Sequence, residues 1–568
     1  MESWRNLTAA EIAQLQTQQN SADNWEDISV VSTFFVGDIF NCHFSGRVKL
    51  GARLSIRDVR LLRNCQVSDD AHLFNVGEIA GEEPPHPFPV EARNEDGSHA
   101  IIAHPDMTVA DAYLCSMVGK DHPLHQLSRQ TICQELANHI GCKVLVKNVA
   151  SMQSVHIGDA AVVAEATQLQ NVYVHSSEEE PTTIGAGVIL RDVVLGLHNT
   201  IDTHAIVRHV LTGDGVSLTD GLRITHCVVG DNSRLSCCEV LFSLIFPFHE
   251  QHHNNSFLIA ATVKGQSNIA AGATIGSNHN GRKNDCELLA DRGFWPGLCT
   301  SVKYPSRFAA YTLLVKGDYP YEINLAYPFC LLHNNEKEDV LEVMPAYWWR
   351  YNAFALNRNA QKFTERDRRI KATQHIHTSP LAPDTVEQIL YALNQWQLGE
   401  TLFVQGLENS KRKVRILKSS DCFHWYREML LYYAFSVLGE TWAKHVDELR
   451  KEVAAATPMR WANVGGQLMP VSEARALLEK PAESWAEMHT RYDQLWLRYS
   501  AYDRVMACFV LKYLCDGKPT TEKLSMLAEE GKEVSREFLL RVEQERARDM
   551  ASPFRKATSE NLENCEDF

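Results

Sequence analysis

Two short segments of the chain gather side chains that can move protons or hold ligands. Residues 246–256 have the sequence FPFHEQHHNNS, in which three histidines, one carboxylate and two asparagines lie within eleven residues. Residues 276–285 have the sequence GSNHNGRKND, and RGFWPG and SVK follow before residue 304. Because imidazole, carboxylate, amide and cationic groups occur here beside glycines that shape the backbone, we expect the functional site within residues 246–303.

The chemistry that these residues favour is acyl transfer. An imidazole can take the proton of an attacking hydroxyl or amine, and His253 or His279 is the candidate base. Glu250 and Asn280 are expected to orient that base, while backbone N–H groups of the glycine-rich turns hold the oxyanion. The other polar and aromatic side chains are assigned to substrate binding, with the cations directed at anionic groups: His249, His252, Asn254, Asn255, Asn278, Arg282, Lys283, Asp285, Trp295 and Lys303.

A metal site is an alternative use of the same histidines. Neutral imidazoles ligate zinc and related ions, and His249, His253 and His279 form the candidate set. His252 and His253 are adjacent, and adjacent residues of a strand point to opposite faces, so one of the two would face a given site. A purely structural role is the other alternative, because Asn and His side chains also cap the corners of β-helices by local hydrogen bonds.

The elements that must position these residues show a period of six. A period of six fits neither an amphipathic helix nor an alternating strand. It is typical of a β-helix, in which each short strand places one apolar residue inside a prism and then turns a corner. The rows are Cys42, Val48 and Leu54; Val67, Leu73 and Ile79; Ile157, Val163 and Leu169; Val210, Val216, Leu222 and Val228; Phe257, Val263, Ile269 and Ile275; and Val302, Phe308 and Leu314. The rows resemble hexapeptide-repeat β-helices, in whose usual geometry three such strands make a coil of about 18 residues. That resemblance implies that Phe257 and Ile275 stack directly.

The rows over about 41–80 and 151–325 resemble the left-handed β-helix of hexapeptide-repeat transferases. The phrases FHEQHHNNSFLIAATVKGQSNIAAGATIGSNHNGRKND, RGFWPGLC, KGDYP and MPAYWWRYN resemble an uncharacterised family of long bacterial proteins. In that family a hexapeptide-repeat β-helix carries a helical C-terminal part. The resemblance to hexapeptide proteins implies acetyl-CoA or another acyl donor as cofactor, and a trimer or dimer as assembly. The chain departs from the relatives that carry a Gly-rich nucleotidyltransferase domain, and from the histidine spacing of γ-class carbonic anhydrases.

Helical signals flank and interrupt the β-helix. Thr8 and Glu11 have the spacing of a capping box, and Ile132, Leu136 and Ile140 recur at helical spacing in a long interruption of the rows. Beyond about residue 330 the period of six disappears, and long amphipathic stretches follow. The expected organisation is a helical lead-in over 1–40, a left-handed β-helix over 41–330 with an inserted helical and loop segment at about 82–150, and an α-helical C-terminal domain over 331–568.

Composition narrows the functional class. The 568 residues include 56 Lys plus Arg and 71 Asp plus Glu, and this net charge of −15 argues against a general nucleic-acid coat protein, while it allows a local basic patch. No stretch approaches the roughly 20 apolar residues of a membrane helix, and the first residues lack the pattern of a signal peptide. The 15 cysteines form no CxxC pair and are expected to be reduced thiols. We therefore expect a cytoplasmic protein that acts on a small molecule, without nucleic acid or membrane.

The leading hypothesis is a transferase that moves an acyl or acetyl group to a sugar or nucleotide-sugar, with a histidine as general base. The alternative is a non-catalytic protein that binds a sugar nucleotide or other metabolite, or that serves as a scaffold. A third hypothesis is a metal-dependent site on the clustered histidines.

Overall fold

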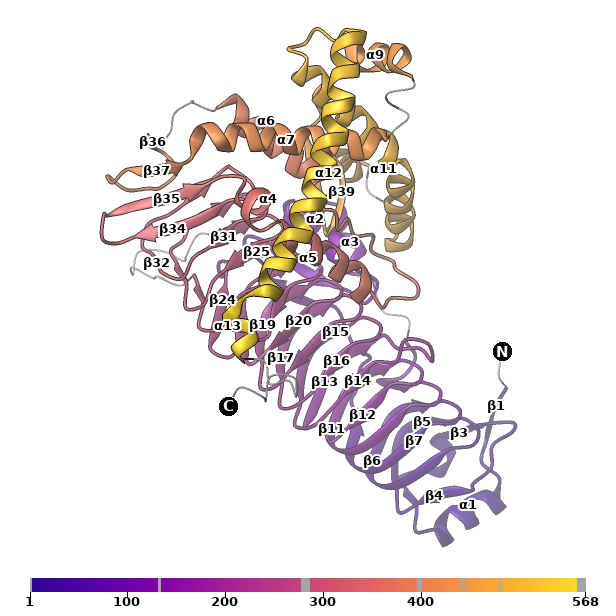
Figure 1. Cartoon of the computed structure of the whole chain (residues 1–568). Coiled ribbons are helices and arrows are strands. Elements are labelled where there is room, and N and C mark those ends of the chain that lie inside the picture. Colours follow the sequence, from indigo (N-terminus) through magenta and orange to yellow (C-terminus); the bar gives the residue numbers. More distant parts are fainter. Residues whose placement is uncertain are drawn as a thin grey trace, which may run out of the picture.

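A computed structural model describes residues 3–130, 134–276, 287–395, 401–439, 442, 445–480 and 482–558. Parallel strands wind into a long β-solenoid, and helices gather at one end of it (Figure 1). The predicted combination of a β-solenoid and a helical C-terminal region is therefore confirmed. Within the described ranges, no helix combines the length and the apolar character needed to cross a membrane.

The coils of the solenoid repeat every 17 residues over most of its length, one residue fewer than expected. Val146 pairs with Val163 in the next coil, and contacts between neighbouring coils join residues 17 apart. The fully buried residues Val146, Met152, Ile157 and Val163 show the cause, because one side of each coil advances five residues instead of six. The shorter side still closes the prism, since each side needs to place only one apolar residue inside.

The shorter coil overturns the expected stacking of Phe257 on Ile275. Leu258 pairs with Ile275, and Phe257 pairs with Thr274. Leu258 is fully buried, whereas Phe257 is only partly buried at the surface of the prism. All the other residues of the six-residue rows are buried.

The strands of the solenoid form one hydrogen-bonded network. They are β2 (Ser21–Ala22), β3 (Ile28–Val31), β4 (Asp38–Phe40), β5 (His43–Leu50), β6 (Ser55–Val67), β7 (His72–Ala80), β10 (Asn138–Ile140), β11 (Leu145–Ile157), β12 (Val162–Ala164), β13 (Gln168–Val174), β14 (Thr183–Ile184), β15 (Ile189–Leu195), β16 (Thr200–Ile201), β17 (Ile206–Thr212), β18 (Ser217–Thr219), β19 (Arg223–Val229), β20 (Arg234–Ser236), β21 (Cys238–Leu241), β22 (Leu244–Ile245), β23 (Glu250–Gln251), β24 (Ser256–Ile259), β25 (Ala261–Val263), β26 (Thr274–Ile275), β27 (Leu288–Ala290), β29 (Ser301–Val302), β30 (Ser306–Phe308), β32 (Asp318–Tyr319) and β33 (Asn324–Leu325).

The first forty residues contain the expected helix and also the start of the solenoid. α1 (Ala9–Thr17) begins with the predicted capping box between Thr8 and Glu11. A short 3-10 helix (Trp25–Asp27) precedes β3, β1 (Trp4–Asn6) pairs antiparallel with β3, and β3 pairs parallel with β5. The solenoid therefore begins before residue 41, because the apolar side chains of β3 and β4 already lie in its core.

The interruption of the rows contains a hairpin and two short helices. These are β8 (Phe88–Glu91), β9 (Ala100–Ala103), α2 (Val109–Ser116) and α3 (Leu124–Leu127). The spacing of Ile132, Leu136 and Ile140 predicted a helix. That prediction was wrong at Ile140, which lies in β10 and points into the prism. Ile132 is outside the described residues. The insertion packs against the outer surface of the solenoid, where Ala110 and Leu114 join Val228 and Leu244 in one apolar cluster.

The C-terminal region is mostly helical but not wholly so. A six-stranded sheet closes the solenoid, and a hairpin precedes the longest helices. α12 runs from the helical end back along the solenoid (Figure 1). The strands are β28 (Trp295–Pro296), β31 (Leu313–Leu314), β34 (Leu331–Asn335), β35 (Val340–Met344), β36 (Thr401–Val404), β37 (Val414–Leu417), β38 (Trp461–Val464) and β39 (Gln467–Pro470); the helices are α4 (Tyr347–Tyr351), α5 (Ala353–Arg366), α6 (Pro383–Asn394), α7 (Ser419–Leu438), α9 (Val446–Ala455), α10 (Val471–Glu479), α11 (Trp485–Leu514), α12 (Thr521–Ala551) and α13 (Pro553–Thr558).

Candidate functional site

A cleft of about 390 Å³ lies where the side of the solenoid meets α5. Ser217, Arg234 and Glu250 hold equivalent positions in successive coils, since Ser217 pairs with Arg234 and Arg234 pairs with Glu250. α5 adds Lys362 and Arg366 to the lining. We call this space the Glu250 cleft; it is lined by Ser217, Thr219, Arg234, Leu235, Ser236, Glu250, His252, Asn268, Lys362 and Arg366.

Glu250 joins the solenoid to α5 at the cleft. Its side chain is only 10% exposed. Lys362 Nζ donates to Glu250 Oε2 at 2.7 Å, and Arg366 donates to the other carboxylate oxygen. Burial opposes ionisation of Glu250, but the two cations outweigh burial and hold the pKa of the carboxyl below its ordinary value. The carboxylate of Glu250 therefore holds α5 against the solenoid through two ion pairs.

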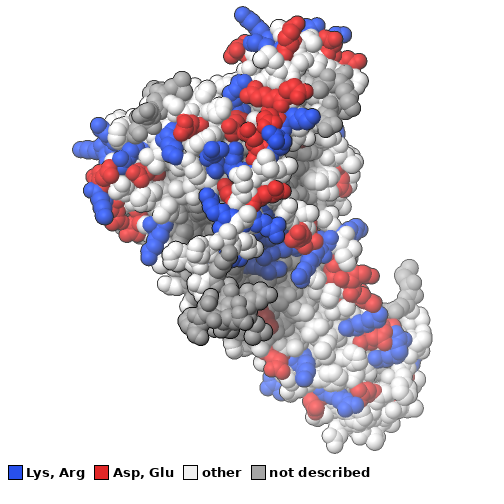
Figure 2. Space-filling model, in the orientation of Figure 1, with Lys and Arg blue, Asp and Glu red and all other residues white. Residues whose placement is uncertain are grey.

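Positive charge exceeds negative charge in the Glu250 cleft. Arg234, Lys362 and Arg366 face one carboxylate, that of Glu250. Arg234 is exposed and forms no ion pair within the part of the chain that the structure describes. Figure 2 shows Lys and Arg side chains gathered in a hollow near the position of β20 and α5 in Figure 1. A local excess of cations in a chain with a net charge of −15 favours an anionic ligand.

His252 supplies an imidazole at the edge of the cleft. Partial burial lowers the pKa of His252. Glu250 raises this pKa, whereas the nearby His253 and Lys362 lower it further. The ring of His252 lies 4.4 Å from that of His253, measured between centroids. A neutral imidazole beside a cationic cleft can accept a proton at neutral pH.

The other predicted residues of the first segment lie outside the cleft. His249 is fully buried, with Nδ1 2.8 Å from Ser267 Oγ and Nε2 3.2 Å from Gln251 Oε1. Burial lowers the pKa of His249 to about 4, which keeps this core histidine neutral. His253, Asn254 and Asn255 are exposed in the turn that precedes β24, and none of them lines the cleft. Among the described residues, no group of three or more His, Cys, Asp or Glu side chains is arranged to hold a metal ion.

Of the predicted residues between 276 and 303, the structure describes Trp295 and Lys303. Asn278, His279, Asn280, Arg282, Lys283 and Asp285 lie outside the described residues. Trp295 packs edge-on against Trp348, with ring centroids 5.2 Å apart, and so belongs to the junction with the helical region. Lys303 Nζ lies 3.1 Å from Glu322 Oε1 in an ion pair on the solenoid. Neither residue lines the Glu250 cleft.

Three cations of the cleft were not predicted from the sequence. Arg234 lies in a coil before the histidine segment, and Lys362 and Arg366 come from the helical region. The four-residue spacing of Lys362 and Arg366 indicates that they share a helix face. Nothing in that spacing shows which coil the face covers.

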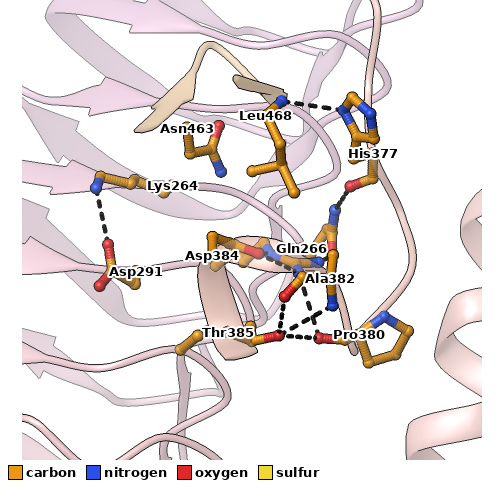
Figure 3. A network of polar contacts seen from close by, with 12 residues as sticks. Lys264, Gln266, Asp291, His377, Pro380, Ala382, Asp384, Thr385, Asn463 and Leu468 are labelled. Carbon is orange, nitrogen blue, oxygen red and sulfur yellow. Dashed lines mark hydrogen bonds and ion pairs between the residues drawn. The ribbon is translucent and has the colours of Figure 1, made fainter. Parts of the chain in front are cut away.

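A buried polar network fixes the helical region on the solenoid (Figure 3). Arg292 Nε and Nη2 donate to the two carboxylate oxygens of Asp384 at 2.7 and 2.8 Å. Gln266 Nε2 donates to the carbonyl oxygen of His377 at 2.6 Å, and His377 Nδ1 accepts from the amide of Leu468 at 3.0 Å. Burial, followed by the charge of Arg292, lowers the pKa of His377 to about 3. These contacts hold the segment that follows α5, and so help to keep Lys362 and Arg366 in place.

Comparison with known proteins places the chain in a family. The sequence matches the family described as Domain of unknown function (DUF4954) over residues 4–83 and 52–398. The chain belongs to this family. An uncharacterized protein of Treponema pallidum (strain Nichols) is 32% identical over 648 residues, which cover 98% of this chain and 89% of the relative. The expected resemblance to an uncharacterised bacterial family is thus confirmed, and the whole Glu250 cleft lies within the part of the chain that matches DUF4954.

Proposed function

We propose that the Glu250 cleft binds an anionic small molecule and that the protein is an acyltransferase acting on a sugar or nucleotide-sugar. The observation that carries this proposal is the set of Arg234, Lys362 and Arg366 around one carboxylate, with an imidazole beside them. Arginine and lysine bind phosphate groups, which acyl-CoA donors and nucleotide-sugars both carry. We also propose that the solenoid is the left-handed, hexapeptide-type β-helix of such transferases, which its buried rows of apolar residues support.

In this proposal His252 takes the role of general base. The imidazole accepts the proton of the attacking acceptor hydroxyl as its oxygen bonds to the carbonyl carbon of the acyl donor. The carbon–sulfur bond of the donor then breaks, and the leaving thiolate takes the proton from the imidazolium, which returns His252 to its neutral form. Ser217 and Thr219 line the cleft and offer hydroxyl groups to a sugar. No disulfide joins two of the described cysteines, which supports a reducing, cytoplasmic setting.

Turnover measurements test the transferase. Acetyl-CoA consumption is measured over a panel of nucleotide-sugars with the full chain, His252→Gln, His253→Gln and the distant exposed control His445→Gln. General-base catalysis contributes about 100-fold or more, so His252→Gln should lose that factor while the other two variants keep their rates. Turnover that His252→Gln retains would contradict the role of His252. Rates at background with every acceptor would contradict the acyltransferase.

A binding function without catalysis is the second candidate. It is favoured by the contacts of Glu250, whose carboxylate is occupied by Lys362 and Arg366 rather than by a histidine. Without an orienting carboxylate the imidazole of His252 is a weaker base. Calorimetric titration with UDP-N-acetylglucosamine and CoA separates the two functions. Binding that Arg234→Gln weakens, without turnover of the ligand, supports the binder.

A further inference from the structure

A second cavity, of about 420 Å³, lies where the last coils of the solenoid meet α6 and β38. It shares no lining residue with the Glu250 cleft. Its size is in the range of small-molecule sites, which also tend to lie between domains. Figure 3 shows Lys264 and Asp291 from the solenoid, Asp384 from α6 and Asn463 from β38 around this region. Three separate parts of the chain, the solenoid, α6 and β38, therefore build one space.

Lys264 provides a partly buried cation with unused donors in this cavity. Its Nζ lies 2.8 Å from Asp291 Oδ1, and Gln388 Nε2 donates to the other oxygen of Asp291 at 2.7 Å. Burial opposes the charge of Lys264, but Asp291 outweighs it and raises the pKa of the ammonium. An ammonium has three N–H donors, and Asp291 is the one partner of Lys264 among the described residues. The remaining donors are available to a ligand.

Arg307 brings a second cation without a carboxylate partner. It is exposed on β30, lines the cavity and forms no ion pair within the described ranges. Asn324 pairs with Arg307 in register in the next coil and lines the same space. By contrast, Arg292 is bound on both sides of its guanidinium by Asp384 and the carbonyl oxygens of Ser379 and Pro380. The charges free to meet a ligand are therefore positive.

The rest of the lining suits a ligand with a polar ring attached to its anionic group. Tyr391 of α6 is 54% exposed and presents its ring at the cavity. Asn463 is buried, and its Oδ1 accepts from the amide of Gly466 at 2.8 Å, which fixes the orientation of the side-chain amide. Arg460 lies beside them and is paired with Glu387.

We infer that this cavity is a second ligand site, which binds the phosphate group of a small metabolite through Lys264 and Arg307. The inference stands independently of the proposed acyltransferase, because the two spaces have different linings. A phosphate accepts hydrogen bonds from both cations, while Asn324 and Tyr391 contact the attached group. A phosphate on a sugar and a phosphate on a nucleotide share this chemistry.

Calorimetric titration of the full chain with inorganic pyrophosphate tests the site. All variants carry Arg234→Gln, which weakens the Glu250 cleft and leaves the second cavity to dominate the signal. Arg307→Gln should lower the remaining affinity about tenfold or more, because a charge-assisted contact to phosphate is lost. The matched control Arg475→Gln removes an exposed arginine of α10 outside the cavity and should change nothing.

Four outcomes decide the inference. Weakened binding in Arg307→Gln with an unchanged control supports the site. Equal binding in both variants, or no saturable binding in the Arg234→Gln background, overturns it. Titration with glucose 6-phosphate and with AMP then shows which attached group the cavity prefers. If Arg307→Gln weakened the binding of neither compound, that result would also count against the site.

Discussion

Mild acid is expected to destabilise the solenoid through a stack of rings on neighbouring coils. His139, His156 and Tyr173 lie in consecutive coils, with ring centroids 4.8 and 4.1 Å apart. His156 Nδ1 lies 2.9 Å from Gln134 Oε1. Burial, followed by the charges of His139 and His175, lowers the pKa of His156 to about 3. The folded protein therefore holds this ring neutral in conditions that protonate it in the unfolded chain.

The sign and size of the effect follow from the two pKa values. An unfolded histidine has a pKa of about 6.5. Stability is complete above that pH and is lost progressively as the pH falls from about 6.5 to about 3, because the unfolded chain binds the proton first. At pH 5, His156 alone lowers the free energy of unfolding by about 2 kcal/mol relative to its value at neutral pH.

Replacing the ring isolates this contribution. His156→Phe keeps an aromatic ring between His139 and Tyr173 but cannot titrate, and His253→Phe changes an exposed histidine instead. Free energies of unfolding are measured in urea at pH 7.5 and 5.0 by circular dichroism. The difference between the two pH values should shrink by about 2 kcal/mol in His156→Phe and stay unchanged in His253→Phe. An unchanged difference in His156→Phe would refute the argument that this partly buried ring stays neutral.

Two further predictions concern the packing of the coils. Gly77→Ala would place a Cβ 2.2 Å from the carbonyl oxygen of Ala150, whereas Gly119→Ala meets nothing within 4 Å. We expect a loss of about 1–3 kcal/mol for the first and no loss for the second, and equal melting temperatures would contradict the close approach of β7 to β11. Leu258→Ala should cost about 2–5 kcal/mol because it opens a cavity in the prism. Phe257→Ala should lower the free energy of unfolding clearly less in the same urea titration, since Phe257 is only partly buried. A larger loss for Phe257→Ala than for Leu258→Ala would contradict the 17-residue coil and favour one of 18 residues.

The sequence predicted the solenoid because its signal is local. A row such as Ile157, Val163 and Leu169 records the period at which a short strand and a turn repeat. The same rows gave a wrong prediction at Phe257. One side of the coil is a residue shorter, so the neighbouring apolar residue Leu258, and not Phe257, pairs with Ile275. Helical spacing also misled at Ile140, where pairing with β6 and β11 outweighs local preference.

For the site, the sequence located two of the residues that line the Glu250 cleft, Glu250 and His252. It assigned Glu250 to orienting a histidine, whereas the carboxylate meets Lys362 and Arg366. It grouped His249 with the binding residues, whereas the imidazole is buried within the solenoid. Residue type identified groups able to do chemistry, but only their surroundings show which groups are free.

The sequence by itself determined that the chain winds into coils, the class of fold and the region where polar groups accumulate, because each of these depends on residues close together in the chain. Tertiary structure alone decided where α5 lies, and with it the cationic character of the Glu250 cleft. Arg234 and Lys362 are separated by more than a hundred residues, and they meet because buried contacts such as Arg292 to Asp384 hold the helical region against the solenoid. Those contacts join residues far apart in the chain, so no local pattern encodes them.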